Sequence, residues 1–168
     1  SQVSLEREFK FKHSTLTWTG IPIMAANMDT VGTFEMALAL AKEKLFSCIH
    51  KHYSVEEWSS FLQKAPAEIV NYIAVSTGTG KEDASKIAEI IKANPLLKFI
   101  CIDVANGYSE HFVSFLKQRK EFATKDFAPT VYMTGPLATT FEPSVYLNLE
   151  EDEPFNLVKT VDDGIKMV

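Results

Sequence analysis

Four short apolar runs recur along the first part of the chain, and each is followed by a turn and a stretch of different periodicity. The runs cover 21–27, 45–50, 69–76 and 99–103. A continuously apolar run of this length is typical of a strand buried on both faces. In the stretches that follow, apolar residues recur three or four positions apart, which is typical of a helix with one buried side. The pattern therefore predicts four strand–helix units.

Capping residues mark the ends of the predicted helices. Ser54 is followed three residues later by Glu57, which is the spacing of a capping box. Pro66 and the Asn94-Pro95 pair are expected to end the second and third helices, because proline cannot continue a helix. The other predicted N-terminal caps are Thr33 and Ser109.

Four consecutive strand–helix units, at intervals of roughly thirty residues, indicate right-handed crossovers between parallel strands of one sheet. The pattern fits an open sheet and a barrel equally well. A complete eight-unit barrel takes about 250 residues, so these 168 residues can supply only part of one. In both architectures ligands bind beyond the carboxyl ends of the strands, and we expect function at that edge.

The regular rhythm weakens in the last part of the chain. A fifth strand is expected at 131–134 and a sixth at 164–168, with prolines and the acidic cluster 150–153 between them. That cluster is interpreted as a solvated loop and not as a metal site. We therefore expect the whole chain to form one domain, with strand–helix units in 1–117 and a divergent tail in 118–168.

Composition and charge restrict the class of partner. The chain is 46% hydrophobic and 23% charged, which suits one globular domain with a core. Its net charge of -5 argues against nucleic acid or an anionic membrane as the main partner, because both require a dense basic face. No secretory leader pattern or long apolar span is recognised, so a cytoplasmic location is expected.

Cys48 and Cys101 each lie inside one of the apolar runs. We interpret both thiols as small buried hydrophobic groups, because a buried apolar cysteine is common and inert. A disulfide between them is not expected in a reducing compartment.

Three charged residues follow predicted strands and are expected to meet at one edge of the sheet. Asp29, Lys51 and Asp103 each fall at or just after a strand end. A lysine beside a carboxylate can hold a phosphate or transfer a proton. The same pair can also be a purely structural ion pair, and the spacing alone does not separate these readings.

Two other motifs carry weaker signals. His50 and His52 share one face of an extended strand, but no third ligand stands at a recognised spacing, so ordinary packing histidines are preferred to a metal site. The glycine-rich loop 77–81 lacks the spacing of a P-loop. It is interpreted as a tight strand-to-helix turn that retains some capacity for an anion.

Four long segments carry a specific family resemblance. They read IMAANMDTVGTFEM (23–36), IHKHYSVEEW (49–58), VSTGT (75–79) and CIDVANGYSEHFV (101–113). In this order they resemble GMP reductase, of the IMP dehydrogenase/GMP reductase family. Together with the N-terminal residues, the resemblance covers about the first 117 residues.

The resemblance implies a fold and a reaction. The fold is a partial or truncated TIM barrel, an α/β architecture in which each parallel strand is followed by a helix. The family reaction is the NADPH-dependent reductive deamination of GMP to IMP and ammonia. By resemblance, Lys51 and Asp103 serve catalysis, and both contact the NADPH cofactor together with Val104 and Ala105.

The resemblance also implies a place for the substrate. Asn27 and Met28 correspond to residues that line the purine pocket for GMP or IMP, whereas Asp29 is expected to support the loop. No metal ligand is implied.

The chain departs from the family pattern at the nucleophile. That nucleophile is a cysteine on a glycine-rich loop after the sixth strand, and these 168 residues contain no such loop. Cys48 and Cys101 lie in strand runs and do not replace it. We therefore expect a GMP reductase-like protein that is inactive as an isolated chain.

A second hypothesis belongs to a different class. A partial barrel leaves a strand edge and an apolar interior that must be covered. The chain is then a non-catalytic nucleotide-binding or interaction module that associates with a full-length enzyme or another partner. Alternatively, the chain is expected to cover the strand edge and the apolar interior by self-association.

Overall fold

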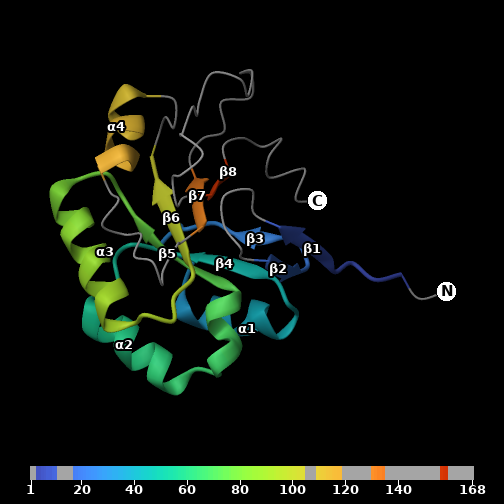
Figure 1. Cartoon of the computed structure of the whole chain (residues 1–168). Helices are drawn as coiled ribbons and strands as arrows, with labels where there is room; N and C mark the ends of the chain where they lie inside the picture. Colours follow the sequence, from blue (N-terminus) through green and yellow to red (C-terminus); the bar gives the residue numbers. More distant parts are fainter. Residues whose placement is uncertain (1–2, 11–16, 105–108, 119–129, 135–155, 159–168) are drawn as a thin grey trace.

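The computed structural model describes residues 3–10, 17–104, 109–118, 130–134 and 156–158. Within these residues a parallel sheet runs in the order β3-β4-β5-β6-β7-β8, so that each strand lies beside the next one in the chain (Figure 1). The strands are β3 (Met24–Ala25), β4 (Phe46–Ile49), β5 (Ile73–Thr77), β6 (Phe99–Asp103), β7 (Thr130–Thr134) and β8 (Asn156–Val158).

Helices connect the first strands as the sequence pattern predicts. They are α1 (Phe34–Lys42), α2 (Val55–Lys64), α3 (Lys81–Ala93) and α4 (Glu110–Gln118). The capping box of α2 is confirmed, since Ser54 Oγ accepts from the Glu57 backbone N–H and the Glu57 carboxylate accepts from the Ser54 backbone N–H. At α1, Thr33 Oγ1 accepts from the Met36 backbone N–H at 3.1 Å. The caps therefore satisfy helix-end donors that the helices cannot pair internally.

Two of the expected strands are shorter than their apolar runs. The run 21–27 forms a strand only at β3, and the Met24 side chain there is 37% exposed. Within the described residues β3 pairs with β4 alone, so it is an edge strand and lacks the second neighbour that buries a central strand. In the run 69–76, a short 3₁₀ helix, η1 (Ala67–Asn71), takes the first residues, because the chain turns after Pro66 before β5 begins.

The predicted fifth strand is confirmed as β7, whereas β8 was not predicted. Strand β7 includes the predicted residues 131–134, and it pairs in parallel with both β6 and β8. The expected sixth strand at 164–168 lies outside the described residues.

An antiparallel hairpin precedes the sheet, and the sequence pattern did not predict it. It consists of β1 (Arg7–Lys10) and β2 (Thr17–Gly20). Trp18 anchors it, since the indole stacks on Phe9 and its Nε1 donates to the Asn71 carbonyl at 2.8 Å. The alternation of aromatic and polar residues in 7–11 was the available signal for a strand.

Alternate residues of the central strands build two cores on opposite faces of the sheet. One core joins the strands to the helices through residues such as Ile49, Val75 and Ile100, and it contains Trp58 of α2. The other contains Trp18 with strand residues that include Cys48 and Cys101, together with Phe46, Ala74 and Phe99. In Figure 1 the helices α1, α2 and α3 lie away from the β1–β2 hairpin, as these two cores require. The described helices include none long and apolar enough to cross a membrane.

Candidate functional site at the carboxyl edge of the sheet

The carboxyl ends of β3, β4, β5 and β6 share one edge, because these strands are parallel and adjacent. Lys51 follows β4, Asp103 is the last residue of β6, and Asp29 lies in the loop after β3. Strand β5 separates the strands that carry Lys51 and Asp103. The sheet therefore places the three predicted charges on one edge but on different strands.

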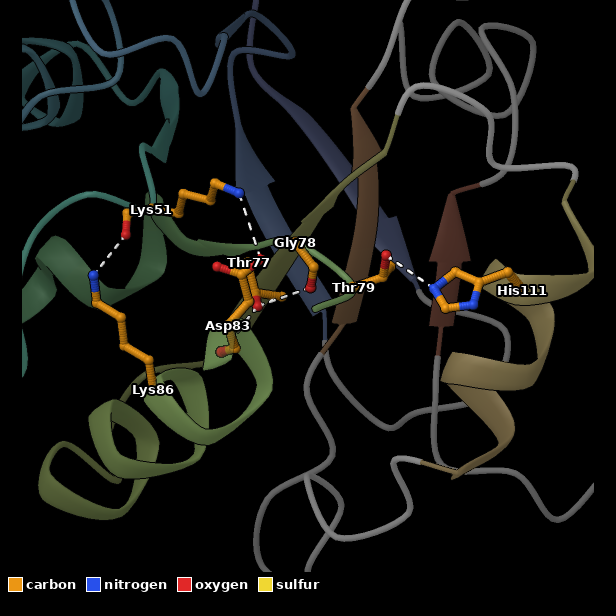
Figure 2. A network of polar contacts seen from close by, with 7 residues as sticks. All are labelled: Lys51, Thr77, Gly78, Thr79, Asp83, Lys86 and His111. Atoms are coloured by element: carbon orange, nitrogen blue, oxygen red, sulfur yellow. Dashed lines mark hydrogen bonds and ion pairs between the residues drawn. The ribbon is translucent and has the colours of Figure 1, made fainter. Parts of the chain in front are cut away.

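Lys51 finds its carboxylate partner on a helix. Its ammonium Nζ lies 3.4 Å from Asp83 Oδ2, and both side chains are about one-third exposed, at 37% and 30%. Lys86, one turn further along α3, donates from Nζ to the main-chain carbonyl of Lys51 at 2.8 Å. Figure 2 shows both contacts, with α3 holding the side chain and the backbone of Lys51 at once.

The glycine after β5 leaves the space in which this pair forms. A Cβ at Gly78 would lie 2.2 Å from Asp83 Oδ2 and 3.1 Å from Lys51 Nζ. Thr77, just before it, donates from its hydroxyl to the Gly78 carbonyl at 3.0 Å and to the Asp83 carbonyl at 3.3 Å (Figure 2). The 77–81 turn is thus built around the ion pair, which explains a glycine here without any phosphate.

A separate contact links this turn to α4. The Thr79 hydroxyl and His111 Nε2 lie 3.3 Å apart across the neighbouring strand end (Figure 2). Thr79 is half-buried and His111 is exposed. This pair presents a hydroxyl and an imidazole at the same edge as Lys51.

The residues that end β6 are open to solvent in part. Asp103 is exposed, and Val104 is half-buried and packs on the helix-side core. Ala105, the fourth predicted cofactor residue, lies outside the described residues. An exposed carboxylate beside a packed backbone is a suitable position from which to bind a polar ligand.

The loop after β3 packs against the sheet at Gly32 and is exposed to solvent at Met28. The Met28 side chain is 59% exposed, Asn27 is half-buried, and the Met28 carbonyl accepts from the Gly32 backbone N–H at 2.7 Å. The Gly32 carbonyl in turn accepts from the His50 backbone N–H at 2.9 Å. A Cβ at Gly32 would lie 2.2 Å from the Cys48 carbonyl, so only glycine fits there.

The two histidines around Lys51 shape its turn. His50 is only 7% exposed and stacks on Tyr53, with ring centroids 4.2 Å apart. The His52 backbone N–H donates to His50 Nδ1 at 3.2 Å, which requires that nitrogen to be unprotonated. Burial, and next the neighbouring His52, lower the pKa of His50 below its usual 6.5. The described residues contain no cluster of three or more His, Cys, Asp or Glu side chains that could hold a metal ion.

Both thiols are buried on the side of the sheet that faces the hairpin. Cys48 and Cys101 are each fully buried and do not form a disulfide, and Cys48 Sγ donates to Met24 Sδ at 3.2 Å. Contact with Cys101, and then burial, raise the pKa of Cys48 well above its ordinary value. A protonated buried thiol is a poor nucleophile, as the sequence predicted for these two residues.

Sequence reasoning missed Asp83 and Lys86. They stand three positions apart in the first turns of α3, so they share one helix face. Such a spacing signals a polar face but does not say which strand end lies beside it. Only the packing of α3 against the neighbouring unit brings this face to Lys51.

Among the described residues each of the parallel strands β3, β4, β5 and β6 is followed by a helix, and polar side chains collect at the carboxyl edge of the sheet. This arrangement defines an α/β protein built from βα units, the class that includes TIM barrels. The sequence matches the family described as IMP dehydrogenase / GMP reductase domain over residues 2–142. This chain therefore belongs to the IMP dehydrogenase / GMP reductase family. The match extends to residue 142, past the end near 117 that the four segments indicated.

The sequence relatives specify the match further. GMP reductases from Salmonella arizonae and Salmonella newport are each 54% identical to this chain over 138 residues, which is 82% of the chain and 40% of the relative. The chain thus spans less than half the length of these relatives. The predicted resemblance to GMP reductase is confirmed.

The fold has a solved neighbour. The crystal structure of inosine 5′-monophosphate dehydrogenase from Legionella pneumophila matches with a TM-score of 0.63 at 20% identity, covering 82% of this chain and 39% of that one. The likeness confirms the predicted fold class, and the described sheet is part of a TIM barrel.

Proposed function

We propose that these 168 residues form the part of a GMP reductase that binds the nicotinamide cofactor and one side of the purine nucleotide. The observation that carries the proposal is the 54% identity to GMP reductases over 138 residues, together with a family match over residues 2–142 that includes the ends of β3, β4, β5 and β6. The reaction is then the NADPH-dependent conversion of GMP to IMP and ammonia. A cytoplasmic location accords with that substrate.

The described residues suit a polar cofactor. Lys51 is partly exposed and fixed by α3, and Asp103 is exposed at the end of β6. Ser76 Oγ, two residues before Gly78, is buried and has no hydrogen-bond partner among the described residues. An unpaired buried hydroxyl is costly, so a polar ligand group at this end of β5 is favoured.

Each residue then has a role. NADPH, when bound, supplies the hydride. The ammonium of Lys51 is a positive charge and a transferable proton at the edge of the sheet. Asp103, Val104 and Ala105 bind the nicotinamide end of the cofactor. Asn27 and Met28, in the loop after β3, contact the purine.

The test is ligand binding with a parallel assay for turnover. We expect the 168-residue chain to bind NADPH in isothermal titration and to form no IMP from GMP, since both of its cysteines are buried in strands. Lys51→Ala should weaken NADPH binding about fivefold, the upper range for a partly exposed charge. Lys92→Ala, which removes an exposed lysine at the far end of α3, is the matched control.

Two results would contradict the proposal. If the chain is folded but does not bind NADPH, it does not contain the proposed cofactor-binding site. Formation of IMP by the chain alone would show that the family's cysteine loop is dispensable.

A second candidate function is an interaction module. It is favoured by apolar side chains at and around the edge strand β3, where Ile23 is 59% and Met28 59% exposed. Such a patch at a strand edge is suited to self-association or to a full-length partner. Sedimentation velocity tests this, because a concentration-independent monomer would exclude self-association, and Ile23→Lys should shift any oligomer toward monomer.

A further inference from the structure

We propose that Asp83 is a positioning residue for Lys51, and that α3 holds this lysine by a two-point clamp. The inference rests on the proposed function, because Lys51 is taken to meet the cofactor. Its evidence is local: Asp83 Oδ2 lies 3.4 Å from Lys51 Nζ, and Lys86 Nζ lies 2.8 Å from the Lys51 carbonyl. Asp83 and Lys86 thus fix the two ends of one residue.

The clamp counters the conformational freedom of lysine. A lysine side chain has four rotatable bonds, and fixing it costs rotamer entropy. The Asp83 carboxylate at the ammonium restricts the side chain in part, and the Lys86 donor holds the backbone, before any ligand arrives. A ligand that binds Lys51 then meets a pre-organised cation.

The surroundings of Asp83 are arranged for this contact. Thr77 Oγ1 donates to the Asp83 main-chain carbonyl at 3.3 Å, which fixes the backbone of the first turn of α3. The absent Cβ of Gly78 leaves room for the carboxylate, since that Cβ would lie 2.2 Å from Oδ2. None of the described glycines has a positive φ, so Gly78 is required for space and not for backbone freedom.

Gly78 and Gly80 form a matched pair for testing the space requirement. Gly78→Ala must displace the Asp83 carboxylate, whereas a Cβ at Gly80 would lie 3.4 Å from the same Oδ2, an ordinary contact. We expect Gly78→Ala to release the Lys51 side chain and Gly80→Ala to leave it ordered. The readout is ¹³C relaxation of the Lys51 ε-methylene in lysine-labelled chain, assigned with Lys51→Arg.

The same relaxation measurement applies to Asp83→Asn and to a control at the adjacent position. Asp83→Asn keeps the shape of the side chain and removes its charge, so we expect the ε-methylene of Lys51 to become mobile. Glu82→Gln removes an exposed charge from the same helical turn and should leave it ordered. An equally ordered Lys51 in Asp83→Asn would overturn the proposal.

A double-mutant cycle on NADPH binding separates positioning from a general charge effect. If Asp83 acts through Lys51, the fivefold loss expected from Lys51→Ala falls to less than about twofold in the Asp83→Asn background. If Asp83 acts only as a nearby charge, the two effects multiply and the positioning role is wrong. Should Asp83→Asn fail to fold, Lys86→Met provides the cycle, because it removes the donor to the Lys51 carbonyl and keeps the apolar stem.

The two proposals fail in different ways. If the order of Lys51 depends on Asp83 but the chain does not bind NADPH, the proposed function is wrong and the clamp stands. If the chain binds NADPH and Lys51→Ala weakens that binding as much in the Asp83→Asn background as in the unsubstituted chain, the clamp is wrong and the proposed function stands.

Discussion

His50 shows how a single residue can couple pH to the turn that carries Lys51. Its ring is buried against Tyr53, and its Nδ1 accepts the His52 backbone N–H. Protonation would place a charge in this buried position and turn the acceptor into a donor. Burial, and next His52, lower the pKa of His50, while a backbone hydrogen bond, Asp29 and Glu57 act in the opposite direction.

The lowered pKa gives a defined pH dependence. The unfolded chain binds a proton at His50 near pH 6.5, whereas the folded chain binds it only at lower pH. The contribution of His50 to stability is therefore complete above pH 6.5 and is lost as the pH falls through the folded pKa. We expect the free energy of unfolding in urea to fall between pH 7.5 and pH 5.5.

The control for this measurement is His50→Asn, whose Oδ1 can replace Nδ1 as acceptor and does not titrate. The pH dependence should be shallower in this variant than in the unsubstituted chain. Equal slopes for the two chains would show that other groups cause the loss.

Lys51 and its carboxylate partner show what can and cannot be predicted for single residues from the sequence. The sequence correctly placed Lys51 and Asp103 after strands, because a strand end can be read from the apolar run before it. It did not identify Asp83 as the partner of Lys51, since that contact depends on how a helix packs beside another unit. Parallel strands bring residues to one edge, but side-chain reach decides which of them pair.

At the scale of elements, the loop from β3 to α1 is fitted closely to the next strand. Gly32 lies against the Cys48 carbonyl of β4, and its own carbonyl accepts from the His50 backbone N–H. The backbone of β4 cannot shift without breaking its hydrogen bonds to the neighbouring strands. A side chain at Gly32 would therefore clash with it.

Gly32→Ala is therefore expected to destabilise the chain by about 1–3 kcal/mol, the usual cost of overpacking. The added Cβ would lie 2.2 Å from the Cys48 carbonyl and 2.8 Å from the Ala26 carbonyl, both main-chain atoms. Urea unfolding followed by circular dichroism measures the loss. Gly80→Ala, with an ordinary contact of 3.4 Å at its Cβ, should unfold close to the unsubstituted chain, and equal losses for both would contradict the packing argument.

The helices were the most predictable elements. The capping box at Ser54 and Glu57 and the stop at Asn94 are local interactions, so the sequence alone specifies them. The hairpin β1–β2 was not predicted, and β3 is shorter than its predicted run, because both depend on distant partners. Trp18 of β2 needs the Asn71 carbonyl, and β3 needs a neighbour on each side to be buried.

At the scale of the whole molecule, the two cores share the strands β4, β5 and β6. Alternate residues of each strand contribute to opposite faces, so neither core can lose its packing while the sheet remains intact. The chain has two tryptophans, Trp18 in the hairpin-side core and Trp58 in the helix-side core, and both are buried. Each is thus a reporter for one face.

We expect the two faces to unfold in one transition. Single-tryptophan variants, Trp18→Phe and Trp58→Phe, should give urea curves in which the remaining indole fluorescence coincides with the loss of helix measured by circular dichroism. Earlier loss of the Trp18 signal than of the Trp58 signal would show that the hairpin-side core opens first and that the faces are independent.

The sequence by itself determined the strand–helix rhythm, the helix caps, the fold class and the family resemblance. These depend on local periodicity, on short-range hydrogen bonds and on long motifs, all of which are written along the chain. Tertiary structure alone decided that Lys51 pairs with Asp83, that His50 is buried against Tyr53, that Gly32 must lack a side chain, and that Gly78 leaves room for the Asp83 carboxylate. The Lys51–Asp83 and Gly32–Cys48 contacts join residues from different strand–helix units, and the burial of His50 depends on the elements that pack around its turn. These features follow from packing in three dimensions and not from spacing in sequence.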